Sequence, residues 1–468
     1  MRLLAALLLL PAALAAQATP PARVAAVAIL DEAITRQGGD SALRAIRTAR
    51  LDVMTQWQRF HFGTHPFADG PSYERHQDLR DYATASWRNS RAFIPSGAAV
   101  DIVRDTVAGR TLAGPGGATQ AMALNSAYVQ ERRELFAFAP ERTLLLAREA
   151  RDLRRVADTT IDGALHRRVS ATVDGFPATW AIRERDGLLA MVRFSADEDA
   201  DFGLAPYGVQ EVEVWFSGWR RLPPGVMYPM QRDIRRVGRP YKRMTAISAV
   251  LNAPAPPDSF AIADSIVAQF LATQRGPMWD ASLDATQVAD SAFVAFPPFI
   301  GTSAALRVGG SWVLIETGQS KGAAAKTAAW LERTTGTKVG AGIVTMPSTS
   351  NGGAGWFAEQ RLPLHVAPGA VPMLRAMLGA TRAARASTVE ASRWVRVGSD
   401  SLWLERLELP DLNGALAVYS PTHRWLYFAI LGTPQVKADQ DALVARLRAR
   451  GLAVEWVANV RAIRTPAP

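Results

Sequence analysis

The feature that most constrains the fold is a series of short strand-like segments between residues 48 and 252. The clearest are 178–185 and 188–195, which are joined by Asp186-Gly187. An Asp-Gly pair between two such runs predicts a β-hairpin with a type I′ turn. Residues 211–216 alternate in the manner of a half-buried strand. This region is therefore predicted to be mostly antiparallel β, with few helices.

From residue 288 onward, strand-like and helical patterns alternate instead. The Pro-rich stretch 252–258 marks a boundary between the two regions. The chain is therefore predicted to be α+β, with a β-rich domain at 22–257, a linker at 258–285 and a second domain at 286–465. The expected strands and helices of the second domain lie at 292–296, 304–308, 312–316, 322–334, 339–344, 371–379, 402–409, 416–420, 426–431, 440–450 and 453–457.

The N-terminus has the layout of a secretory signal peptide, predicted to span residues 1–18. Arg2 precedes an apolar stretch at 3–14, and small alanines follow it. That stretch is too short to span a bilayer comfortably, and no later segment reaches transmembrane length. The mature chain is expected to be exported, periplasmic or secreted, and to lack a transmembrane segment.

Composition excludes several classes of function. The chain has no cysteine, so disulfides, thiolate zinc sites and a cysteine nucleophile are ruled out. Its net charge of +10 is spread along the sequence without a basic tail. Nucleic acid is therefore not an expected partner.

A turn rich in Gly, Ser and Thr at 345–357 follows the apolar run 339–344 and leads into a helical pattern. Turns between a strand and a helix are where α/β proteins place chemistry. Together with the segment Ser-Trp-Val-Leu-Ile-Glu-Thr-Gly at 311–318, this arrangement resembles the metallo-β-lactamase fold. The resemblance implies an αββα sandwich over about 286–465, with metal-binding histidines and an aspartate at this turn.

The family's ligand positions, laid on this chain, fall on side chains that bind zinc poorly. Zinc is held by His, Cys or carboxylate side chains, and only Asp411 could bind a metal. The resemblance therefore implies a degenerate site with no metal and no other cofactor. Its positions are Met346, Ser348, Ser350, Asn351, Asp411 and Ile430.

The region before the boundary resembles the half-barrel domain of periplasmic lipoprotein carriers. The motifs are Gly-Gly-Asp-Ser-Ala-Leu-Arg-Ala-Ile at 38–46 and a strand leading into Leu-Asn-Ala-Pro at 251–254. The resemblance implies a curved antiparallel sheet with an apolar cavity. Four tryptophans are candidates to line that cavity, although each is equally plausible as ordinary core: Trp57, Trp87, Trp180 and Trp215.

Other candidate sites rest on single features. Lys321 begins a helix and could bind an anion there, and Arg235 and Arg236 belong to the densest basic run. Whether His61, His65 and His76 bind a metal is left open. Ser348 and Ser350 could be nucleophiles only with an activating base, and none stands out in the sequence.

These observations favour an exported, non-catalytic binding protein with a metal-free pseudo-hydrolase domain. Its expected partner is a lipid or other apolar small molecule, or another envelope protein. The alternative is a divergent hydrolase of the metallo-β-lactamase fold that uses non-standard site residues. A purely structural envelope protein is a third hypothesis.

Overall fold

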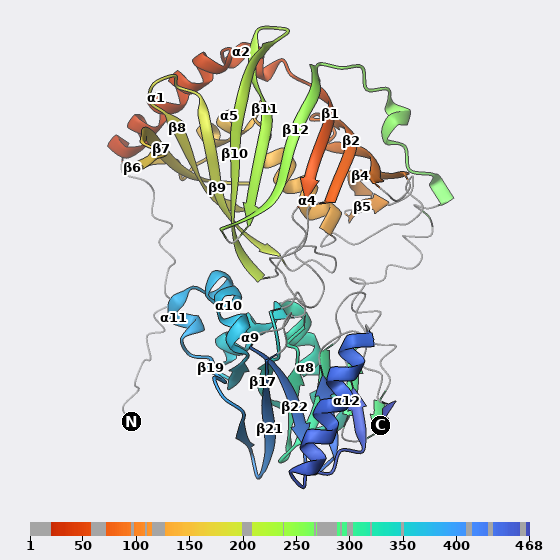
Figure 1. Ribbon diagram of the computed structural model, residues 1–468. Helices are drawn as coiled ribbons and strands as arrows, with labels where there is room; N and C mark the ends of the chain where they lie inside the picture. Colours follow the sequence, from red (N-terminus) through yellow and green to blue (C-terminus); the bar gives the residue numbers. More distant parts are fainter. Residues whose placement is uncertain are drawn as a thin grey trace, which may run out of the picture.

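The structure is a computed structural model that describes residues 20–57, 72–94, 98–107, 110–114, 127–198, 208–236, 238–265, 268, 288–290, 293–296, 303–318, 321–347, 351–408, 414–428, 434–458 and 465–468. Its N-terminal half is built on one twelve-stranded sheet, and its C-terminal half on two smaller sheets (Figure 1). The prediction of a mixed α+β chain is confirmed.

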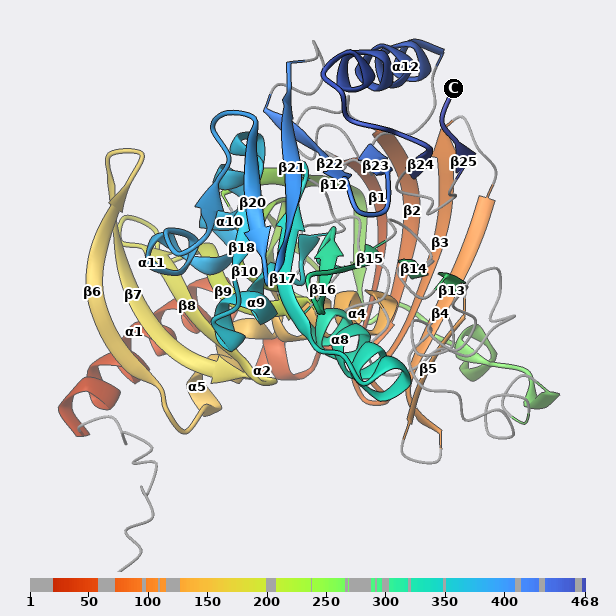
Figure 2. The same ribbon diagram turned by 90° about the horizontal axis from the view of Figure 1, so that it is seen from below.

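The N-terminal sheet is antiparallel throughout, in the order β5-β4-β3-β2-β1-β12-β11-β10-β9-β8-β7-β6. Strands that follow one another in the chain pair with each other, except β5 and β6, which lie at the two edges of the sheet. Strand β1 also pairs with β12 and thereby joins the first strands to the last. Figure 2 shows the strands curving between β6 and β5. The strands are β1 Thr48–Trp57, β2 Ser72–Asp81, β3 Ser86–Ile94, β4 Ala98–Val107, β5 Arg110–Gly114, β6 Arg154–Ile161, β7 Ala164–Val173, β8 Phe176–Arg183, β9 Leu189–Glu198, β10 Gly208–Leu222, β11 Val226–Arg236 and β12 Arg239–Leu251.

Helices cover one face of this sheet, called here the helix-covered face. Helix α1 packs on β6, β7 and α5, and α5 packs on β7. Apolar side chains of α1, α5 and the strands from β7 to β12 form one core, in which the buried Trp180 donates a hydrogen bond to Thr143 at 2.8 Å. Helix α4 lies farther along the same face. The helices are α1 Pro20–Gln37, α2 Asp40–Arg44, α4 Ala127–Ala137 and α5 Thr143–Glu149, and a 3-10 turn η1 follows at Pro257–Phe260.

The hairpin predicted at 178–195 is present as β8 and β9, but its turn is not the predicted two-residue type I′ turn. Residues 184–188 form a longer loop. The Asp186 carboxylate accepts hydrogen bonds from the Leu188 amide at 3.0 Å and from Arg183 at 3.2 Å. These side-chain bonds stabilise the wider loop, so the Asp-Gly signal marked the position of the turn and not its length.

The C-terminal half contains a seven-stranded sheet, β13-β14-β15-β16-β17-β18-β19, and a six-stranded sheet, β20-β21-β22-β23-β24-β25. Strands β16 to β19 run parallel, and most of the other pairings are antiparallel. The strands are β13 Val288–Asp290, β14 Phe293–Phe296, β15 Ser303–Val308, β16 Ser311–Ile315, β17 Val339–Val344, β18 Leu364–Val366, β19 Ser387–Thr388, β20 Arg393–Val397, β21 Asp400–Leu407, β22 Ala415–Ser420, β23 Trp425–Phe428, β24 Trp456–Ala458 and β25 Thr465–Pro466.

Both C-terminal sheets contribute to a single apolar core, so they pack face to face. Helices α8 and α9 contact β17, while α12 adds Leu443, Val444 and Leu447 to the same core. The helices are α8 Lys321–Thr335, α9 Ala354–Gln360, η3 Pro368–Ala370, α10 Val371–Leu378, α11 Ala380–Ala383 and α12 Pro434–Ala449. Helix α10 contacts β10, which brings the two halves together. Among the described residues, no helix is long and apolar enough to cross a membrane.

Candidate functional site

The helix-covered face holds a buried chamber lined by both charged and apolar side chains. Burial alternates along strand β2. Glu74, His76, Asp78 and Arg80 are all less than 5% exposed, while the residues between them face outward or are only half-buried. The chamber encloses a cavity of about 60 Å³. We call it the polar chamber; it is lined by Thr55, Trp57, Glu74, His76, Asp78, Trp87, Asn89, Arg91, Glu131, Glu134, Leu135, Phe138, Phe194, Val214, Arg232, Ile234, Arg236, Tyr241, Lys242 and Met244.

Helix α4 closes the polar chamber through ion pairs with the sheet. Glu131 pairs with Lys242, and Glu134 accepts a hydrogen bond from Arg236 at 2.7 Å. The Lys242 ammonium also lies 3.9 Å from the centre of the Trp57 ring. Burial would raise the pKa of Glu131, but the charge of Lys242, its hydrogen bond to Glu131 and the charge of Arg91 together lower that pKa. Glu131 is therefore held ionised by a cation from a distant strand.

Charges on β2 compensate one another in the same way. Arg80 donates to Asp78 at 3.1 Å and lies 3.8 Å from Glu141. The His76 ring lies between two carboxylates, with Nδ1 3.1 Å from Glu74 and Nε2 3.7 Å from Asp78. Burial would raise the pKa of Asp78, yet the charges of His76 and Arg80 lower it. The buried charges thus form a network, because an uncompensated buried charge would be costly.

Several buried polar atoms around the cavity have no hydrogen-bond partner among the residues that the structure describes. They are Glu74 Oε2, Asp78 Oδ1, Asn89 Oδ1, Thr55 Oγ1 and Trp87 Nε1. Their side chains are at most 6% exposed, and Asp78 and Asn89 are cross-strand neighbours on β2 and β3. Buried polar atoms are nearly always hydrogen-bonded to protein, water or ligand. The polar chamber is therefore built to receive water or a polar group.

The sequence led us to expect an apolar cavity here, and the cavity that the structure describes has apolar side chains in its lining together with charged ones that were not expected. Trp57 and Trp87 do line the polar chamber. Trp180 instead lies in the apolar core beneath α5. Trp215 lies on the opposite face of the sheet, where Arg235 covers its ring at 5.5 Å.

A second candidate site lies in the C-terminal half, at the turn after β17. Glu316, which follows β16, is completely buried and has a positive φ of 57°. Its carboxyl accepts hydrogen bonds from the Thr345 hydroxyl and from Asn351 Nδ2, the latter at 2.5 Å. Burial raises the pKa of Glu316 to about 7, although these two hydrogen bonds lower it. Burial and the Glu316 charge also raise the pKa of Tyr427 well above its usual value.

The positions of the degenerate metal site are only partly described. Met346 is 1% exposed and belongs to the apolar core. Asn351 is fully buried, donates to Glu316 and to the Met346 carbonyl, and accepts a hydrogen bond from the Thr317 amide. Ser348, Ser350, Asp411 and Ile430 lie outside the described residues. Within the described part, no group of three or more His, Asp or Glu side chains is placed to hold a metal.

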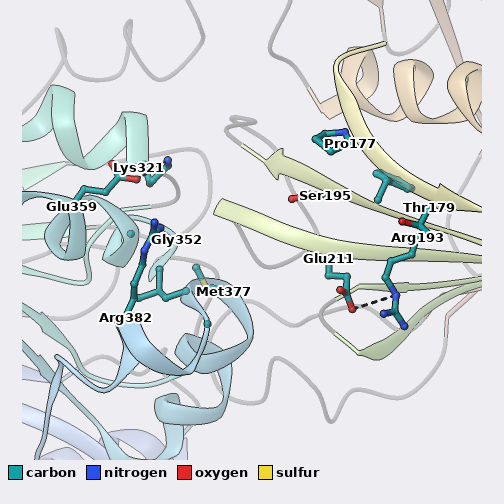
Figure 3. A pocket seen from close by; sticks show the side chains of 14 residues that line it. Pro177, Thr179, Arg193, Ser195, Glu211, Lys321, Gly352, Glu359, Met377 and Arg382 are labelled. Atoms are coloured by element: carbon teal, nitrogen blue, oxygen red, sulfur yellow. Dashed lines mark hydrogen bonds and ion pairs between the residues drawn. The ribbon is translucent and has the colours of Figure 1, made fainter. Parts of the chain in front are cut away.

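A third site is a cleft of about 440 Å³ between the two halves. Figure 3 shows Arg193 and Glu211 on the wall formed by the outer face of β9 and β10. Lys321, Glu359 and Arg382 lie on the facing wall. We call this site the cleft; its lining residues are Pro177, Thr179, Arg193, Phe194, Ser195, Glu211, Lys321, Gly352, Gly355, Glu359, Met377, Leu378, Gly379 and Arg382.

The remaining sequence candidates are separated by the fold. Arg235 is exposed on the outer face, whereas Arg236 is buried on the helix-covered face and paired with Glu134. The two arginines therefore do not share one surface. His76 lies in the polar chamber, while His61 and His65 fall outside the described residues. Lys321 lines the cleft and pairs with Glu359 at 3.0 Å.

Sequence reasoning named Trp57, His76, Trp87 and Arg236 but missed most of the charged residues of the polar chamber, and it missed Glu316. One signal was available: four ionisable residues recur at every second position of 74–80, as on one face of a strand. Charged residues are rarely buried, so this pattern did not indicate an inward-facing strand. Glu316 carried no such signal.

No protein-family model and no curated protein matches the chain. Among solved structures, it is similar to a metallo-β-lactamase from Pontibacter korlensis, with 14% identity and a TM-score of 0.31 over 39% of this chain and 92% of that one. It is also similar to a putative outer membrane lipoprotein-sorting protein domain from Vibrio parahaemolyticus, with 8% identity and a TM-score of 0.32 over 51% of this chain and 97% of that one. A third similar structure is a DUF1329 family protein from Desulfovibrio piger, with 8% identity and a TM-score of 0.28 over 50% of this chain and 96% of that one. The chain therefore has distant structural similarity to metallo-β-lactamases and to lipoprotein-sorting domains.

Proposed function

We propose that this chain is an exported, non-catalytic binding protein whose polar chamber holds the polar end of a small amphipathic molecule. The observation that carries this proposal is the set of unpartnered buried polar atoms around the cavity. A cavity of about 60 Å³ has room for roughly four to six water-sized groups, since each needs about 10–15 Å³ of this volume. That is the size of an ethanolamine or glycerol group.

The lining indicates which chemistry the ligand presents. Glu74 Oε2 and Asp78 Oδ1 are acceptors, so a bound group would donate N–H or O–H bonds to them, while Trp87 Nε1 could donate to an oxygen of the same group. Phe138, Phe194 and Met244 also line the cavity and can contact an apolar portion of the ligand. This revises the lipid hypothesis from an apolar ligand to an amphipathic one with an amine or hydroxyl head.

We also propose that the C-terminal half is a metal-free pseudo-hydrolase domain with an αββα arrangement, joined to a lipoprotein-carrier-like domain. Two residues support this. Met346 packs in the apolar core. Asn351 donates a hydrogen bond to Glu316 and accepts one from the Thr317 amide. A side chain committed to structural hydrogen bonds in this way is a poor candidate for a metal ligand or a catalytic group.

Intrinsic tryptophan fluorescence can test ligand binding, because Trp57 and Trp87 line the polar chamber. The full chain would be titrated with lysophosphatidylethanolamine and 1-monooleoylglycerol, whose heads donate hydrogen bonds, and with palmitate, whose ionised head does not. Binding of either donor-headed probe, and not of palmitate, is expected. Glu74→Gln should weaken this binding about tenfold, the value of one hydrogen bond to a charged group.

Gln77→Ala is the matched control, because Gln77 lies on the same strand but is exposed on the other face. Its probe affinity should equal that of the unmodified chain. Palmitate binding equal to that of the donor-headed probes would restore the apolar-ligand hypothesis. Binding of none of the three probes would leave the polar chamber as a water-filled structural network and overturn the proposal.

A further inference from the structure

We infer that the cleft between the two halves is a second binding site, and that it takes a small anion bearing carboxylate or phosphate groups. Its volume of about 440 Å³ falls in the range of small-molecule sites. The site is distinct from the polar chamber, because it lies on the outer face of the N-terminal sheet and the polar chamber lies on the helix-covered face.

Cations from both halves face the cleft. Arg193 comes from β9, Lys321 from the start of α8 and Arg382 from α11. Figure 3 shows Arg382 extending toward Gly352, on the wall that also carries Lys321. The carboxylates of Glu211 and Glu359 line the cleft beside these three cations.

Each wall already pairs one cation with one carboxylate. Arg193 lies 3.7 Å from Glu211 and donates to Glu213 at 2.6 Å, and Lys321 lies 3.0 Å from Glu359. Arg382 is exposed and forms no ion pair with any residue that the structure describes. Arginine binds carboxylate and phosphate oxygens with two parallel N–H donors. Arg382 is therefore the residue around which an anion would be held.

Three glycines are among the residues that line the cleft, namely Gly352, Gly355 and Gly379. Gly355 is required for the position of Lys321, because a Cβ there would lie 2.9 Å from Lys321 Cγ. Gly352 directly follows Asn351 of the turn after β17. The cleft therefore opens beside the turn at which the sequence suggested functional residues, and a bound anion would contact both halves.

Isothermal titration with inorganic phosphate and with citrate would test the site and distinguish the two anion chemistries. We expect at least one of them to bind, and Arg382→Gln, Lys321→Gln and Arg193→Gln each to weaken it about tenfold. Arg385→Gln is the matched control, since Arg385 is exposed three residues from Arg382 but does not line the cleft. All four side chains are at least partly exposed, so folding should persist, which circular dichroism would verify.

Two outcomes would overturn the inference: neither anion binds, or Arg193→Gln binds as the unmodified chain does, because the site would then not span the two halves. The Glu74→Gln variant separates this test from that of the polar chamber. It should keep full affinity for the anion while losing affinity for the amphipathic probe.

Discussion

The two halves bury carboxylates in opposite ways. In the polar chamber, Asp78 and Glu131 are surrounded by cations, and their pKa values are lowered despite burial. In the C-terminal half, Glu316 has only neutral hydrogen-bond donors, and burial raises its pKa to about 7. Asp78 and Glu316 are almost equally buried, at 2% and 0% exposure, yet one is ionised and the other is neutral at mildly acidic pH. The partner side chains, and not the depth, decide the charge state.

The largest effect is expected from breaking the charge network of the polar chamber. Arg80→Met would leave Asp78 and Glu141 without their buried cation. Removing one member of a buried ion pair costs about 3–5 kcal/mol of unfolding free energy. Urea denaturation would measure the loss.

Arg75→Met provides the comparison on the same strand. Arg75 pairs with Asp52 on the outer face, and its side chain is 55% exposed. Exposed ion pairs contribute about 0–1 kcal/mol. Equal costs for the two variants would show that the network is not buried as described.

The next effect is a pH dependence that originates in Glu316. Its pKa is about 7 in the folded state and 4.5 for an ordinary glutamate. Because the pKa of Glu316 is raised in the folded state, its protonation contributes to the free energy of unfolding. This contribution is fully present below pH 4.5 and is lost as the pH rises through 7. Glu316→Gln cannot ionise, so its stability relative to the unmodified chain should improve by about 2–3 kcal/mol from pH 5 to pH 8.

Denaturation midpoints of both proteins across that pH range would measure this difference. Glu332→Gln serves as a control, because Glu332 is exposed on α8 and pairs only at the surface with Lys338. A constant difference between Glu316→Gln and the unmodified chain would mean that Glu316 is already ionised in the folded protein at pH 5.

A smaller effect is expected from removing one of the neutral hydrogen-bond donors to Glu316. Thr345→Val removes the hydroxyl that donates to Glu316. Since that bond lowers the pKa of Glu316, its loss should move the pH dependence to higher pH. The accompanying loss of stability should be about 1 kcal/mol at neutral pH. A shift of the pH dependence to lower pH would contradict this assignment.

The last prediction is that removing metal ions has no effect on stability. If the C-terminal half is stabilised by its apolar core and the Glu316 network, a chelator should leave its melting temperature unchanged. Elemental analysis of the purified chain should accompany the melt. Stoichiometric zinc, or a collapse of the melting temperature in chelator, would restore the hydrolase hypothesis, because structural zinc contributes directly to folding.

Much of the secondary structure could be predicted from local patterns. The strands of the 178–195 hairpin and the strands on either side of α8 lie close to where their patterns placed them. Strand β2 and helix α4 were missed. The inward face of β2 is charged, and α4 carries four charged residues among eleven, so neither shows the apolar periodicity on which prediction relies.

The sequence by itself determined the α+β class, the change of pattern near residue 252, the position of the central hairpin and the lack of zinc-binding side chains at the expected turn. These follow from residue type and local spacing, which are properties of neighbouring residues. Only the tertiary structure decided which charges are buried together. Glu131 and Lys242 are 111 residues apart, and Asn351 is 35 residues from Glu316. The folded sheets bring these groups together, and their charge states depend on that proximity.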